Sequence, residues 1–156
     1  MLKKTLFLLL LSIAFFSCEE DINKKLNEIH SEIISIDTHT DTPFNFLEED
    51  FDIGKWNNFE ETFSRVDFPR MEAGKLDAVF MAVFVGQGIR NDEGNRIAKE
   101  RALEIFNAVH DNVVQYPEMA ELAYTSDDVY RLKKEGKRAV YLGVENGYPR
   151  SEEHTS

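Results

Sequence analysis

The chain has 156 residues, of which 42% are hydrophobic, and a formal net charge of −11. So acidic a protein is unsuited to binding nucleic acid or to adsorbing on anionic lipid through its own surface. It contains one cysteine, which excludes a framework of internal disulfides.

Residues 1–17 have the regions of a bacterial lipoprotein signal peptide, with Lys3-Lys4, an apolar stretch from Thr5 to Phe16, and Ser17 before Cys18. The apolar stretch is shorter than the ~20 residues that a membrane-spanning helix needs. We therefore expect cleavage before Cys18, lipidation of Cys18, and anchoring of an exported protein to a membrane of the cell envelope by acyl chains. The alternative is an ordinary signal peptide followed by a stray cysteine.

Residues 18–32 are interpreted as a tether, because Ile22, Leu26 and Ile29 recur at helical spacing. Ile33-Ile34-Ser35-Ile36 then predicts a short buried strand that leads into Asp37-Thr38-His39-Thr40-Asp41-Thr42-Pro43. Alternate side chains of a strand share a face, so we expect His39 and Asp41 to project together from its C-terminal end. An imidazole and a carboxylate placed there can bind a divalent metal such as zinc, although the two residue types also meet in ordinary turns.

The middle of the chain alternates between strand and helix patterns. Residues 44–68 are loop-like and rich in aromatic residues, which we interpret as a loop held on the core by its own aromatic side chains. A strand is predicted over residues 78–85, and a helix with an apolar stripe from Ala98 to Val113 follows it. Thr125 and Asp128 form a capping box for a helix that runs through Lys134 and stops at Gly136.

The last predicted strand, Ala139–Val144, ends at Glu145, just before the turn signal Asn146-Gly147. Barrels of alternating strands and helices carry their chemistry at the C-terminal ends of the strands. Glu145 is therefore a candidate to meet His39 and Asp41 in space. The alternative is a solvated carboxylate at a strand end.

The chain ends in residues 150–156, which show no apolar period. This heptapeptide corresponds to one reading frame of a common sequencing-library adapter, so we expect a non-native tail and do not count His154 as a ligand. The alternative is a genuine hydrophilic C-terminus.

Several blocks, taken in order, resemble the membrane dipeptidase (renal dipeptidase) family of zinc metallopeptidases. Asp37–Pro43 is similar to the family's opening Asp-x-His-x-Asp-x-Pro, and Val66–Met71 with Gly74 and the strand over 78–85 resembles its second unit. Thr125–Asp128, leading on to Gly143–Gly147, resembles its third unit. The resemblance covers residues 33–149 and implies an α/β fold, the N-terminal and incomplete part of a (β/α)8 TIM-type barrel of the metal-dependent hydrolase kind. A complete barrel takes ~250 residues.

The resemblance also implies an activity, which is zinc-dependent hydrolysis of dipeptides. It implies two Zn²⁺ ions in the complete protein, with His39 and Asp41 binding the first and the catalytic Glu145 bridging both. Asp37 would support the site without binding metal, while His30 and His110 match no family position. The remaining ligands and the residues that hold the substrate would come from later strands, so this fragment by itself is expected to be inactive.

Two alternatives remain open. One is another amidohydrolase-type metal-dependent hydrolase, although such enzymes usually open with two histidines one residue apart, and here Asp41 stands in the second position. The other is a non-catalytic surface lipoprotein built on a relic barrel.

Overall fold

The computed structural model describes residues 22–48 and 51–150, which belong to two units divided after Ile34. In the first unit, residues 22–32 form a helix on which Ile22, Leu26 and Ile29 are exposed, and this confirms the predicted helical spacing. The expected signal peptide, Cys18 and the tail after Arg150 lie outside the described residues. Within the described ranges, no helix is both long enough and apolar enough to cross a membrane.

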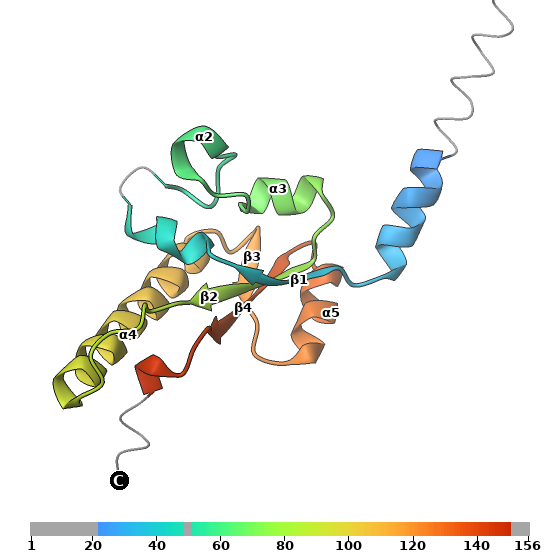
Figure 1. Cartoon of the computed structure of the whole chain (residues 1–156). Coiled ribbons are helices and arrows are strands. Elements are labelled where there is room, and N and C mark those ends of the chain that lie inside the picture. The colour runs from blue at the N-terminus through green and yellow to red at the C-terminus, as the bar shows by residue number, and fades with distance from the viewer. Residues whose placement is uncertain (1–21, 49–50, 151–156) are drawn as a thin grey trace, which may run out of the picture. The chain divides into compact units, whose positions relative to one another are not determined.

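The second unit is built on a parallel sheet of four strands in the order β1-β2-β4-β3 (Figure 1). The strands are β1 (Ile36–Thr40), β2 (Ala78–Val83), β3 (Ala120–Leu122) and β4 (Arg138–Val144). Helical segments connect them: η1 (Thr42–Leu47), α2 (Phe59–Thr62) and α3 (Phe68–Ala73) before β2, α4 (Asp92–Val114) before β3, and α5 (Ser126–Lys134) before β4. This alternation confirms the predicted α/β class.

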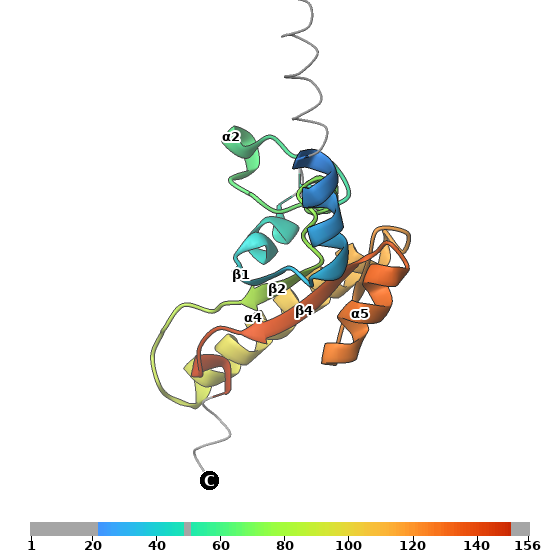
Figure 2. The ribbon, with the colours of Figure 1, turned by 90° about the vertical axis from the view of Figure 1, so that its right-hand side faces the viewer.

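The two faces of the sheet differ in what covers them. Side chains of β2 and β4 on one face, including Val79, Met81 and Val140, pack with Val109 and Val113 of α4. Figure 2 shows α4 lying along one side of these strands. On the other face the rings of Phe80 and Tyr141 stack with centroids 4.7 Å apart and remain partly exposed. Because all four strands are parallel, their carboxyl ends lie at one edge of the sheet.

The predicted capping of α5 is confirmed. The Asp128 carboxylate accepts hydrogen bonds from the backbone N–H groups of Tyr124, at 3.0 Å, and Thr125, at 2.8 Å. These backbone hydrogen bonds lower the pKa of Asp128. At the other end of the helix, Gly136 has a φ of 77°, a left-handed conformation that costs glycine little.

The expectation of a buried strand over residues 33–36 is wrong, because β1 begins at Ile36 and runs to Thr40, and Ile33 and Ile36 are each 45% exposed. Two further features differ from the sequence-based expectation of three strands and a long loop. The first is β3, whose three residues lack a β-branched run and form a strand by pairing with β4, Ala120 opposite Arg138 and Leu122 opposite Val140. The second is the segment 44–68, which contains most of η1 and all of α2. Both are short elements stabilised by tertiary contacts, for which local periodicity carries little signal.

Candidate metal centre

His39 lies in an irregular part of β1. Asp37 pairs with Val79 of β2, whereas Thr40 pairs with Met81, so β1 has one more residue than its partner over this stretch. Such a bulge changes the direction of a side chain, and bulges are frequent next to active sites. The Asp37 carboxylate accepts a hydrogen bond of 3.0 Å from the backbone N–H of His39. Asp37 thus supports the backbone of His39, in agreement with the sequence-based interpretation.

Asp41 comes from a turn and not from the strand itself, because β1 ends at Thr40. It occupies the cap position before η1, where Phe44 donates its backbone N–H to the Asp41 carbonyl at 3.1 Å. Its Oδ1 lies 3.4 Å from Nε2 of His39. His39 and Asp41 are therefore close together, as expected. However, His39 lies in the strand and Asp41 in the turn that follows it, so alternation along a single strand is not the cause.

Glu145 reaches the same place from β4. It is the first residue after that strand, and its backbone N–H donates to the carbonyl of Val83, the last residue of β2, at 3.2 Å. Its Oε2 lies 3.8 Å from Nε2 of His39. Since β2 separates β1 from β4 in the sheet, the two side chains meet across the carboxyl end of β2.

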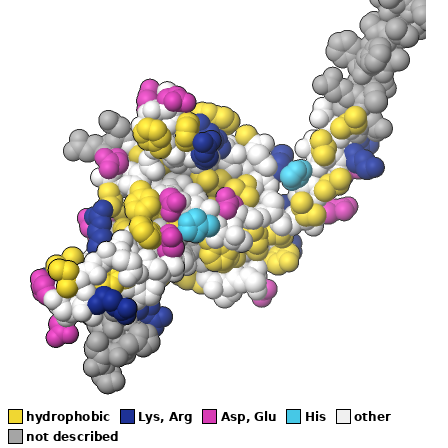
Figure 3. All heavy atoms as spheres, in the orientation of Figure 1, with side chains coloured by type: hydrophobic (Ala, Val, Ile, Leu, Met, Phe, Trp, Pro, Cys, Tyr) yellow, Lys and Arg dark blue, Asp and Glu magenta, His cyan; other side chains and the backbone are white. Residues whose placement is uncertain are grey.

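The three side chains form a group whose geometry suits a metal ion. One ligand atom from each of His39, Asp41 and Glu145 lies within 4.8 Å of the other two. Zinc bonds to imidazole nitrogen and carboxylate oxygen are about 2.0–2.2 Å long, which puts neighbouring ligands of a tetrahedral ion roughly 3.3 Å apart. The two separations from the His39 nitrogen are close to that value. Figure 3 shows a histidine with acidic side chains beside it, open to solvent, on one face of the molecule.

The other histidines of the described chain belong to helices. His30 is on helix 22–32 of the first unit. His110 is exposed on α4, where its Nδ1 is 3.3 Å from the Asp111 carboxylate. His110 is therefore a surface histidine.

A hollow of about 990 Å³ borders His39 and Asp41 of this group. Its lining combines acidic side chains, aromatic side chains and one arginine: Asp37, Asp41, Glu48, Glu61, Phe44, Phe51, Phe63 and Arg65. The sequence predicts that the aromatic side chains of the segment 44–68 hold this loop on the core. Phe51 does so as a buried member of the core, whereas Phe63 is 75% exposed and Phe44 packs edge-on against Phe84 at 5.9 Å. The sequence pattern does not distinguish an aromatic side chain that packs in the core from one that lines the hollow.

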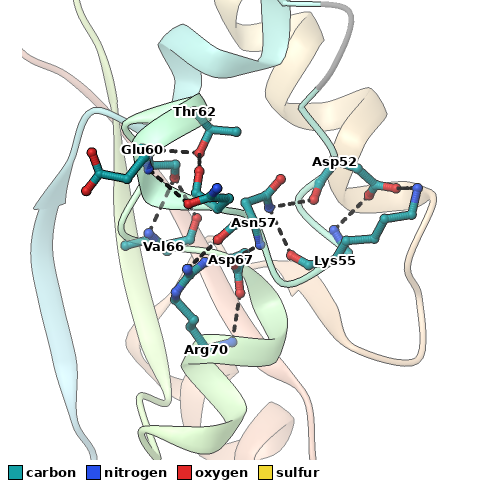
Figure 4. A network of polar contacts seen from close by, with 11 residues as sticks. Asp52, Lys55, Asn57, Glu60, Thr62, Val66, Asp67 and Arg70 are labelled. Atoms are coloured by element: carbon teal, nitrogen blue, oxygen red, sulfur yellow. Dashed lines mark hydrogen bonds and ion pairs between the residues drawn. The ribbon is translucent and has the colours of Figure 1, made fainter.

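A buried polar network holds the wall of this hollow (Figure 4). Asp67, which is fully buried, accepts hydrogen bonds from the backbone N–H groups of Asn57 at 3.0 Å and Arg70 at 2.8 Å. The Arg70 guanidinium donates to both Asp67 and the Asn57 carbonyl, and it lies 4.9 Å above the ring of Trp56. Asn45 of η1 donates to the carbonyl of Thr62, so the wall is also tied to the turn that carries Asp41. This network was not anticipated from the sequence.

Comparison with known proteins identifies a family. The family model described as membrane dipeptidase (peptidase family M19) matches residues 23–155. The crystal structure of the probable dipeptidase PvdM from Pseudomonas aeruginosa is similar at 21% identity with a TM-score of 0.69, over 84% of this chain and 32% of that one. Dipeptidase AC, a metallopeptidase of family M19, is similar at 18% identity with a TM-score of 0.60, over 75% of this chain and 36% of that one.

An amidohydrolase from Pseudomonas aeruginosa gives a weaker structural match, with 19% identity and a TM-score of 0.50 over 79% of this chain and 29% of that one. No curated protein sequence matches the chain. The chain spans about a third of the length of the solved structures. At these identities the solved structures support the fold, which is the TIM-barrel type of the M19 dipeptidases. The family match covers most of the chain, and the chain belongs to the membrane dipeptidase family, peptidase family M19.

Proposed function

We propose that the complete protein is a zinc-dependent dipeptidase and that this chain contains the first part of its metal site. The observation that carries the proposal is the meeting of His39 and Asp41 with Glu145, more than a hundred residues later, within 4.8 Å at the carboxyl edge of the sheet. Exposed acidic groups often lie near one another without a metal. Three further observations support the proposal. The group includes the imidazole of His39, its side chains lie at the carboxyl ends of strands, and the chain belongs to a family of metallopeptidases.

Each residue has a separate role in this proposal. His39 and Asp41 would hold one zinc ion, and Glu145 would be shared between two ions, because a carboxylate offers two oxygens as ligands. Paired divalent ions in such a site lower the pKa of a coordinated water and polarise the carbonyl under attack. The hollow beside His39 and Asp41 provides room for a dipeptide. The remaining ligands and substrate contacts are assigned to later parts of the complete protein, so this chain alone is expected to be inactive.

Replacement of Glu145 by glutamine tests this proposal in the full-length protein. Glutamine nearly conserves the shape of the side chain but lacks the charge that lets a carboxylate bridge two cations. We expect Glu145→Gln to reduce both the zinc content and dipeptide hydrolysis while the fold is retained. The measurements are zinc stoichiometry, turnover of a dipeptide panel, and circular dichroism. Two bound zinc ions and wild-type turnover in this variant would show that Glu145 is an ordinary strand-end carboxylate.

The same proposal includes export and a lipid anchor at Cys18. Its support is the sequence pattern of residues 1–18, which combines a charged start, a short apolar stretch and a serine before the cysteine. The dipeptidase would then work at a membrane of the bacterial cell envelope.

A further inference from the structure

We propose that Asn146 is a positioning residue for Glu145. The inference rests on the proposed metal site and extends it to a residue that binds no metal and that the sequence identifies only as part of a turn. Asn146 follows Glu145 directly, at the point where the chain leaves β4 and the strand no longer restrains it. The direction of the Glu145 carboxylate therefore depends on what holds the backbone on both sides.

The side before Glu145 is held by the sheet. The Glu145 N–H donates to the carbonyl of Val83 at 3.2 Å, which continues the pairing of β4 with β2 by one residue. The side after Glu145 has no strand partner and is held by the Asn146 side chain instead.

Both ends of the Asn146 amide are used. Its Nδ2 donates to the carbonyl of Val85 at 3.0 Å, two residues beyond the end of β2. Its Oδ1 accepts the backbone N–H of Tyr148 at 2.9 Å. A single side chain thus closes the turn after Glu145 and fastens that turn to the segment that follows β2.

Tyr148 extends the attachment. Its ring is buried, with 6% of the residue exposed, and its hydroxyl donates to the carbonyl of Ile89 at 3.0 Å. The backbone packs closely at two glycines beside Tyr148, where no larger residue would fit. A Cβ at Gly88 would lie 2.8 Å from the Tyr148 hydroxyl, and a Cβ at Gly94 would lie 1.9 Å from the carbonyl oxygen of Ile89. The turn after Glu145 is therefore held against residues 85–94 by hydrogen bonds and by shape.

This attachment matters for a metal because the Glu145 side chain is itself only lightly held. It is 37% exposed, and its Oε2 lies 3.8 Å from Nε2 of His39. When the backbone around a ligand residue is fixed, its side chain already points toward the cation. Metal binding then costs less conformational entropy than it would at the end of a mobile loop. Groups that orient metal ligands typically change metal affinity by 10–100-fold when they are mutated.

The test is a titration of the metal-free, full-length protein with Co²⁺, followed by the visible absorption of the bound ion. Asn146→Ser is the principal variant, because serine can still close the turn through the Tyr148 N–H but is too short to reach Val85. Asn146→Ala removes both bonds. Asn112→Ala is the matched control, since Asn112 also donates its side-chain amide to a backbone carbonyl, that of Ala108 at 2.9 Å, but does so on α4.

We expect Asn146→Ser and Asn146→Ala to weaken Co²⁺ binding at least about 10-fold. Asn112→Ala should keep the wild-type affinity, and the metal-free Asn146→Ser protein should melt near the temperature of that control. In a double-mutant cycle, Asn146→Ser should cause no further loss when Glu145 is already glutamine, because a positioning residue acts only through the residue that it positions.

Three results would overturn the inference, and each has a different consequence for the proposed metal site. If the wild-type protein binds Co²⁺ and Asn146→Ser binds it equally well, Asn146 merely forms a turn and the proposed metal site stands. If the wild-type protein binds no Co²⁺, the metal site itself fails and the inference fails with it. The inference would also be contradicted if Asn146→Ser weakened Co²⁺ binding by the same factor in the wild-type protein and in the Glu145→Gln protein.

Discussion

At the scale of single residues, the candidate site depends on three exposed side chains whose backbones are well held. Asp37 accepts the N–H of His39, the turn into η1 fixes Asp41, and the β2 carbonyl at Val83 fixes Glu145. Side chains near the surface contribute little to stability, so substitutions there can separate metal binding from folding.

Removal of one ligand should therefore weaken metal binding without unfolding the protein. We expect His39→Ala or Asp41→Ala in the full-length protein to lose one of two zinc ions and most of the dipeptidase activity. His110→Ala is the control, because His110 is an exposed histidine on α4 beside a carboxylate. Zinc content after dialysis and the melting temperature are the measurements. A His39→Ala protein with the same zinc content as His110→Ala would remove His39 from the ligand set.

At the scale of elements, a buried carboxylate joins the amino ends of three strands, opposite the candidate metal site. Asp77, which is 3% exposed, precedes β2 and accepts the backbone N–H of Ser35, just before β1, at 2.9 Å. Both of its carboxylate oxygens lie 2.8 Å from the ammonium of Lys133 on α5, and Arg138 at the start of β4 is 3.6 Å away. One side chain thus connects three strands and a helix.

Loss of this carboxylate should destabilise the fold and leave the metal site unchanged. Removing one partner of a buried ion pair costs about 3–5 kcal/mol, and since Lys133 keeps some contact with solvent we expect roughly 3 kcal/mol for Asp77→Ala. Glu135→Ala, which removes exposed ion pairs with Arg131 and Lys137, should have a far smaller effect. Urea denaturation compares the two variants, and Co²⁺ titration checks the site. Equal stability of the two variants would contradict a structural role for Asp77.

At the scale of the whole molecule, the proposed lipid anchor would set where the proposed dipeptidase acts. The pattern of residues 1–18 leads us to expect that Cys18 is the first residue of the mature protein and is acylated. Stable attachment to a membrane needs more than one acyl chain, so we expect the anchor to carry several. Mass spectrometry of the mature N-terminus and membrane fractionation of Cys18→Ala are the measurements. Ser17→Ala, which keeps a small residue before the cysteine, is the control. Membrane association that survives Cys18→Ala would contradict the anchor.

Much of this protein follows from local patterns in its sequence. The apolar period of α4 and the capping box of α5 are signals carried by residues three and four apart, and the structure has both helices where they were expected. The candidate ligands were also recognisable, because His39, Asp41 and Glu145 each follow a short apolar run and the ends of parallel strands share an edge.

Other features depend on residues that are distant in the sequence, and only the tertiary structure decided them. The strand β3 exists because β4 offers it a partner, and the bulge at His39 exists because β1 has one residue more than β2 over the same stretch. The Asn146 bond to Val85 joins residues 61 positions apart. A short apolar run indicates that a strand is present, but its neighbours in the sheet, and therefore the separations at the metal site, are set by long-range pairing that no local period encodes.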